Sequence, residues 1–185
     1  MYSVIPVFGI PQISSHDDIA AVIAPALNSI RTTEGSISLW GDDIVVISSK
    51  IIAKSLGLYT KRPENTNLEY LIEHDYMTLD NVPEKLALHA LDDAHEQAGI
   101  VRKGLAARFG GRPGVLITRM DYVKKDDSYY ARPRVIGSAG VEAYSDSGIN
   151  IHESLAYIAT LSMHQFFDCP VVVIRGVDDI LTYED

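Results

Sequence analysis

Short apolar runs at residues 44–47, 115–118 and 171–174 dominate the pattern of hydrophobic positions along the chain. Because successive residues in each run are apolar, both faces of the expected strand are covered, as in a central strand flanked by helices. A weaker run at residues 4–8 contains Pro6, which favours a position at the edge of a sheet.

Helical periodicity begins at Asp17, from which apolar residues return every three or four positions as far as Ile30. Ser15, with Asp18 three residues later, resembles a capping box and predicts the start of this helix. Pro25 lies inside the pattern and predicts a kink or a restart.

Residues 86–109 predict a helix in at least the second half of that stretch. The last helix has the clearest start, since Asn150 can cap it and Glu153 follows three residues later. Helices and strands alternate, so we expect an α/β or α+β fold with a mixed central sheet flanked by helices. The length of 185 residues fits a single domain over residues 1–185.

Two polar stretches, residues 59–67 and 122–134, interrupt these patterns and are expected to be loops. The second is rich in charged and aromatic residues. A long loop of this composition is either functional or solvated and mobile, and the residues alone leave both possibilities open.

The formal net charge of −9 gives no electrostatic driving force for binding nucleic acid. Cys169 is the single cysteine, so an internal disulfide or a cysteine zinc site is excluded. Its apolar surroundings favour a buried thiol over a nucleophile. The sequence shows neither an export signal nor a stretch long enough to span a membrane, which predicts a cytoplasmic protein without membrane contacts.

Candidate chemistry gathers in residues 41–57, where a buried strand leads into Ser48, Ser49 and Lys50. Lys54 follows four residues after Lys50, so on a helix the two lysines share a face. Hydroxyls, ammonium groups and open backbone amides at the end of a strand suit phosphate or carboxylate. The glycine spacing of a Walker A loop is absent. The alternative is a short helix with ordinary surface lysines.

Residues 41–57 resemble the opening motif of the F-420 γ-glutamyl ligase family, G-D-(V/I)-(apolar)3-(S/T)-x-K-(V/I)-x-x-K-x-x-G. Residues 9–13 are similar to the family's G-I-P-x-I, and residues 16–20 to its G-D-D-L-A, with His16 in place of glycine. Further similar segments are residues 100–118, 136–141, 150–156 and 170–176.

This resemblance implies the fold of that family and a GTP-dependent ligase that requires a divalent metal, Mg or Mn. Such an enzyme adds L-glutamate to a carboxylate of an acidic, F-420-type substrate through an acyl phosphate, and the family forms homodimers. Lys50 and Lys54 would be the catalytic lysines. The residues implied for nucleotide or phosphate binding are Gly9, Ile10, Pro11, Ser48, Ser49 and Lys50.

The metal ligands implied by the resemblance are Asp80 and Asp121, at two places where this chain departs from the family. Asp80 stands in residues 78–81 without the family's glycine and serine, and Thr118 is followed by Arg119 where the family has aspartate. Arginine would repel a metal at that position, and both aspartates can also be read as solvated turn residues.

Two other functions therefore stay open. The chain can be a relative that has lost catalysis and binds a nucleotide, a phosphorylated metabolite or a protein partner. It can also be an enzyme of different specificity that uses the same cleft.

Overall fold

The computed structural model describes residues 3–32, 35–36, 39, 43–77, 82–165 and 169–176. The elements of this part of the chain are, in order, β1 (Ser3–Pro6), α1 (Ile19–Ser29), β2 (Arg31–Thr32), β3 (Gly35–Ser36), β4 (Ile44–Ser48), α2 (Ser49–Ser55), β5 (Tyr59–Lys61), α3 (Leu68–Glu73), β6 (Leu86–Leu88), α4 (Ala94–Phe109), β7 (Gly114–Lys125), β8 (Ser128–Ala139), α5 (Ile151–Gln165) and β9 (Val171–Arg175).

Five strands form the main sheet in the order β1-β9-β4-β7-β8. β4 and β7 run parallel, whereas the other neighbouring strands pair antiparallel. The predicted mixed central sheet is therefore confirmed. The three apolar runs are its three inner strands, and the run containing Pro6 is the edge strand β1.

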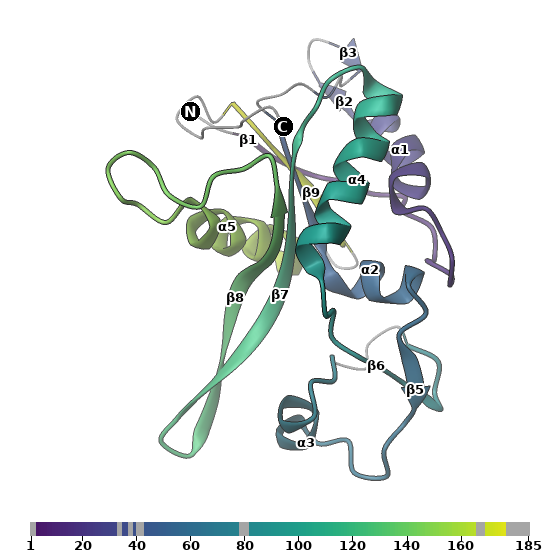
Figure 1. Cartoon of the computed structure of the whole chain (residues 1–185), viewed down its shortest axis with the longest axis vertical. Coiled ribbons are helices and arrows are strands. Elements are labelled where there is room, and N and C mark those ends of the chain that lie inside the picture. Colours follow the sequence, from purple (N-terminus) through teal and green to yellow (C-terminus); the bar gives the residue numbers. More distant parts are fainter. Residues whose placement is uncertain are drawn as a thin grey trace.

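Helices cover both faces of this sheet, with α1, α2 and α4 on one side and α5 on the other (Figure 1). Side chains of β4 alternate between the two resulting cores: Val45 and Ile47 belong to the first, and Ile44 and Val46 to the second. This alternation explains why the strand is apolar at every position.

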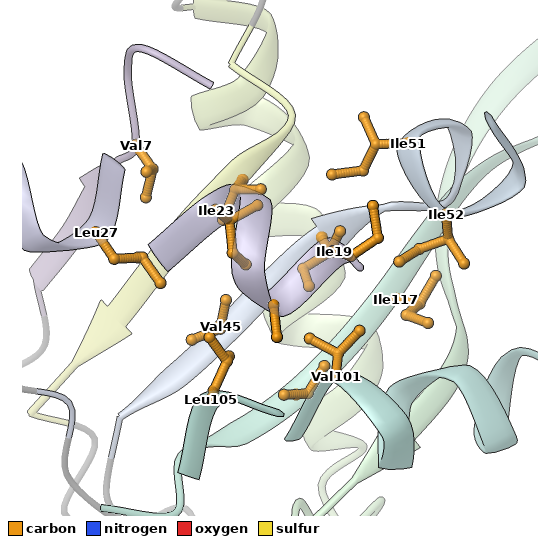
Figure 2. Close-up of a cluster of buried hydrophobic side chains, with 14 of the residues drawn as sticks. Val7, Ile19, Ile23, Leu27, Val45, Ile51, Ile52, Val101, Leu105 and Ile117 are labelled. Carbon is orange, nitrogen blue, oxygen red and sulfur yellow. The ribbon is translucent and has the colours of Figure 1, made fainter. Parts of the chain in front are cut away.

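The larger core fixes the position of α2. Ile51 and Ile52 of this helix pack in one cluster with Ile19 of α1 and Ile117 of β7 (Figure 2). Burying an isoleucine side chain contributes about 1.5–3 kcal/mol, so the two isoleucines hold this face of α2 firmly against the sheet. The opposite face of α2 is left for other contacts.

The predicted N-terminal cap is wrong for α1 and confirmed for α5. α1 begins at Ile19, and its cap is the Asp18 carboxylate, which accepts a hydrogen bond from the Ala21 N–H at 3.3 Å. The predicted capping box from Ser15 is therefore wrong, because Asp18 itself supplies the cap. The helix continues through Pro25 without a restart.

α5 begins as predicted. The Asn150 side chain accepts a hydrogen bond from the Glu153 N–H at 2.9 Å. None of the helices in the described residues is long and apolar enough to cross a membrane.

The predicted loop at residues 122–134 is wrong. These residues belong to a two-stranded ribbon, formed by β7 and β8, that extends beyond the sheet (Figure 1). Only Asp126 and Asp127 connect the strands, and Asp126 has a φ of 55°. Aspartate tolerates such a turn conformation, so a tight hairpin replaces the loop.

The predicted loop at residues 59–67 is partly wrong, because β5 occupies its beginning and pairs with β6. β5, α3 and β6 form a small lobe beside the main sheet. Its core contains Ala53, Met77 and Leu88, so α2 contributes to the lobe as well as to the main core.

Close packing requires glycine at two positions of the segment at residues 136–141. A Cβ atom at Gly137 would overlap the backbone of Ala94, and one at Gly140 would overlap the Arg102 guanidinium. These glycines let β8 approach α4 closely, so that part of the family-like pattern has a structural explanation.

Candidate functional site

A cavity of about 1040 Å³ lies where β4 passes into α2, and it is called the α2 cavity below. Its wall combines α2, the N-terminal segment around Ile10, the small lobe and the near half of the β7–β8 ribbon. The site residues predicted from sequence that line it are Ile10, Pro11, Ser48, Ser49, Lys50, Lys54 and Asp121.

Lys54 is the most unusual of these residues. It is 9% exposed, and it has no hydrogen bond or ion pair within the described part of the chain. Burial, with the Lys50 ammonium one turn away as a second cause, lowers the pKa of Lys54 from its ordinary value of 10.5. A largely buried lysine therefore lines the cavity, and its ammonium group has no counter-charge among the described residues.

The two serines before these lysines have different environments. Ser49 is 2% exposed, and its hydroxyl lies 4.0 Å from the Met77 sulfur. Ser48 occupies the N-cap position of α2, but its side chain makes no capping hydrogen bond. Its backbone N–H donates to the Pro170 carbonyl at 2.8 Å. The Ser48 hydroxyl, at the rim of the cavity, is therefore not used in capping the helix.

The amide groups that the sequence suggested at the start of α2 are a weaker feature. The helix has seven residues, two turns, so few aligned peptide dipoles contribute to its terminal charge. Side chains, and not the end of the helix, therefore provide the positive charge of this site.

Gly9 does not line the α2 cavity, although its neighbours Ile10 and Pro11 do. It has a φ of 79°, and a Cβ atom there would meet nothing within 4 Å. Gly9 therefore acts through backbone conformation, directing the chain after β1 towards the cavity.

Asp121 lines the cavity but is held between two arginines. Its Oδ1 accepts a hydrogen bond from Arg119 Nε at 2.7 Å, and its Oδ2 accepts one from Arg134 Nη1 at 3.1 Å. Each carboxylate oxygen therefore accepts a hydrogen bond from a guanidinium group, and the predicted metal ligation by Asp121 stays a prediction.

Asp80, the other predicted metal ligand, lies outside the described residues. Within the residues that are described, no group of three or more His, Cys, Asp and Glu side chains could hold a metal ion.

Arg119 was recognised in the sequence only as a departure from the family pattern, and not as a site residue. It lines the cavity together with Lys50 and Lys54. Sequence reasoning also missed the apolar wall from the small lobe, which includes Leu71, Met77 and Val82. The spacing of these residues carries no signal for the wall, since it depends on how the lobe packs beside α2.

Cys169 lines the same cavity and is 3% exposed. Its thiol donates to the Val171 carbonyl at 3.1 Å, and burial raises its pKa. This environment favours the thiol form, in agreement with the predicted buried and unreactive cysteine.

A second hollow, of about 630 Å³, lies in the small lobe beside Arg62. The Arg62 guanidinium donates to the Glu84 carbonyl at 3.1 Å and to the Thr66 hydroxyl at 3.2 Å. These contacts give Arg62 a role in holding the loop, and none of the predicted site residues lies there.

Neither protein-family models nor curated proteins yield a match to this chain. The resemblance to the F-420 γ-glutamyl ligases therefore rests on the motifs described above.

Proposed function

We propose that the protein binds a small molecule carrying phosphate or carboxylate, with the negatively charged group beside Lys50 and Lys54. The observation that carries this proposal is Lys54, a largely buried lysine that lines the cavity and whose ammonium group lacks a partner in the described residues. Burial lowers the pKa of Lys54, so its charged form is disfavoured where no counter-charge lies beside it. Perturbed charges of this kind cluster at functional sites, where a ligand supplies the missing charge.

The local charge of the cavity supports the same proposal. The chain carries a net charge of −9, yet the lining contains Lys50, Lys54 and Arg119 against Asp75 and Asp121. The cavity lining therefore has one more cationic than acidic side chain, on a chain whose net charge is negative. The net negative charge of the whole protein repels an anionic ligand at long range. The cationic side chains of the cavity would therefore attract the ligand only at short range.

The part of the cavity lining that comes from the small lobe indicates the chemistry of the rest of the ligand. Leu71, Met77 and Val82 present apolar surface there. A compound with a charged group at the lysines and an apolar body against the small lobe would match both walls, as small-molecule sites usually require.

Calorimetric titration with inorganic pyrophosphate, GDP and GTP tests the proposal. Lys54→Met should weaken binding about tenfold or more, because a charge-assisted contact is lost. Lys103→Met is the matched control, since Lys103 is exposed on α4 and outside the cavity. Equal affinities of the two variants, or no binding of any anion by the parent protein, would contradict the proposal.

A second candidate function is the amide ligase that the resemblance implies. It is favoured by the position of Lys50 and Lys54, which are shared with the family-like motif and face one cavity. In this proposal the protein is a cytoplasmic homodimer that uses GTP and Mg or Mn to join L-glutamate to an acidic F-420-type substrate. Lys50 and Lys54 would hold the phosphates during transfer.

Product analysis separates the ligase from a binding protein. The purified protein would be incubated with GTP, Mg or Mn, L-glutamate and the deazaflavin acceptor. Formation of a glutamyl conjugate, abolished by Lys54→Met but not by Lys103→Met, would establish the ligase. Anion binding without any conjugate would leave the binding function alone, and light scattering on the same sample would test the homodimer.

A further inference from the structure

The Asp121 carboxylate is the only acidic group on the β7 side of the α2 cavity wall within the described residues. Its side chain is 20% exposed, and each oxygen accepts one hydrogen bond from a guanidinium group. With two arginines around one aspartate, this group of three side chains carries a net positive charge. A divalent cation placed at Asp121 would therefore approach two positive charges for one negative charge.

Arg119 is oriented by the same contact. Its Nε donates to Asp121 at 2.7 Å, and this is the single hydrogen bond of its side chain to the described residues. The N–H groups of its two terminal nitrogens therefore make no hydrogen bond to the described residues and can donate to a ligand. The contact with Asp121 fixes the plane of the guanidinium. A planar fork of N–H groups held in this way matches two oxygens of a phosphate.

Arg119, Lys50 and Lys54 line the same cavity from two different elements, β7 and α2. The guanidinium thus lies on the β7 side of the cavity lining, and the two ammonium groups lie on the α2 side. Those side chains supply the positive charge that a bound metal supplies in many phosphate sites.

We propose that Arg119, positioned by Asp121, binds the phosphate of the ligand in the place of a divalent cation, so that anion binding at the α2 cavity does not require a metal. This inference rests on the proposed function, since it concerns how the same cavity neutralises its anion. It also assigns Arg119 a binding role and Asp121 a positioning role, in contrast to the metal ligation that the resemblance implies for the aspartate.

Calorimetric titration of the full chain with inorganic pyrophosphate and with GDP, in excess EDTA and in excess magnesium, tests this inference. We expect the affinity in EDTA to equal or exceed that in magnesium, because magnesium competes for the anion and adds nothing at the site. Binding that appears only with magnesium would overturn the inference and leave the proposed function standing. Binding in neither condition would overturn both.

Three variants sharpen the test. Arg119→Met should weaken binding in EDTA about tenfold or more, whereas Arg119→Lys should recover part of the loss because it restores the charge without the planar fork. Arg134→Met is the control: Arg134 contacts Asp121 but does not line the cavity, and its side chain is 58% exposed. An equal loss in Arg119→Met and Arg134→Met would overturn the direct role of Arg119.

Discussion

The two ends of β4 differ in whether the buried charged residue beside them has an ion-pair partner. Asp43, immediately before the strand, is fully buried, and its carboxylate accepts hydrogen bonds from Arg175 Nε at 2.8 Å and Nη2 at 2.7 Å. At the other end, α2 buries Lys54 with no such partner in the described residues. A paired charge at one end serves the architecture, and an unpaired charge at the other indicates a place for a ligand.

The largest effect should come from breaking the paired end. Asp43→Ala leaves the partly buried Arg175 without its carboxylate, and we expect the free energy of unfolding to fall by about 3 kcal/mol. Urea denaturation measures the loss. Replacing both partners, with Asp43→Leu and Arg175→Met together, should restore much of the stability. A double variant as unstable as the sum of its single changes would contradict the coupling between the two side chains.

A smaller effect of opposite sign is expected at the unpaired end. Lys54→Met removes a charge that burial penalises, so the folded protein should be as stable as the parent or more stable by about 1 kcal/mol. The variant should also bind anions poorly. A marked loss of stability would show that Lys54 has a structural partner and would weaken the contrast between the two ends.

The difference in the free energy of unfolding between the parent protein and Lys54→Met should depend on pH, which gives an independent check. The pKa of Lys54 is lowered in the folded state, so between this pKa and 10.5 the unfolded chain holds a proton that the folded chain has released. Stability contributed by this site therefore rises with pH through that window. Urea denaturation of the parent and of Lys54→Met over a pH series should show the variant's advantage shrinking as pH 10.5 is approached.

The smallest effect is expected at the tip of the β7–β8 ribbon. Lys124 lies 3.8 Å from the Glu69 carboxylate and 5.6 Å from the centre of the Tyr129 ring, but it is 54% exposed. Lys124→Ala should change the free energy of unfolding by no more than about 0.5 kcal/mol, because solvent screens exposed pairs. A larger loss in urea denaturation would mean that the tip is more tightly held than its exposure suggests.

The central sheet was predictable because its inner strands are apolar on both faces, a pattern that loops rarely show. The ribbon was not predictable in the same way. At residues 122–134 neither face enters a core, so no alternation of apolar and polar residues marks the strands. Cross-strand pairs such as Val123 with Tyr130 define the ribbon, and such pairing depends on a register that the linear sequence does not display.

The candidate site was also predictable only in part. A helical spacing of four residues was enough to place Lys50 and Lys54 on one face, and both line the cavity. The contact between Arg134 and Asp121 depends on the pairing of β7 with β8, so it was not accessible from local spacing. Asp80 lies outside the described residues, and its predicted metal ligation stays a prediction.

One irregularity in the sheet has a consequence for how this protein can change during evolution. The register between β7 and β8 shifts between Ile117 and Thr118, so that Ile136 has no opposite residue. Such a bulge bends and twists the strands beyond it, and those strands carry Arg119 and Asp121. Deletion of the single residue Ile136 would remove the bulge and change the direction of the strand segment that carries Arg119 and Asp121. One deleted codon would therefore alter ligand recognition more than several substitutions of surface side chains.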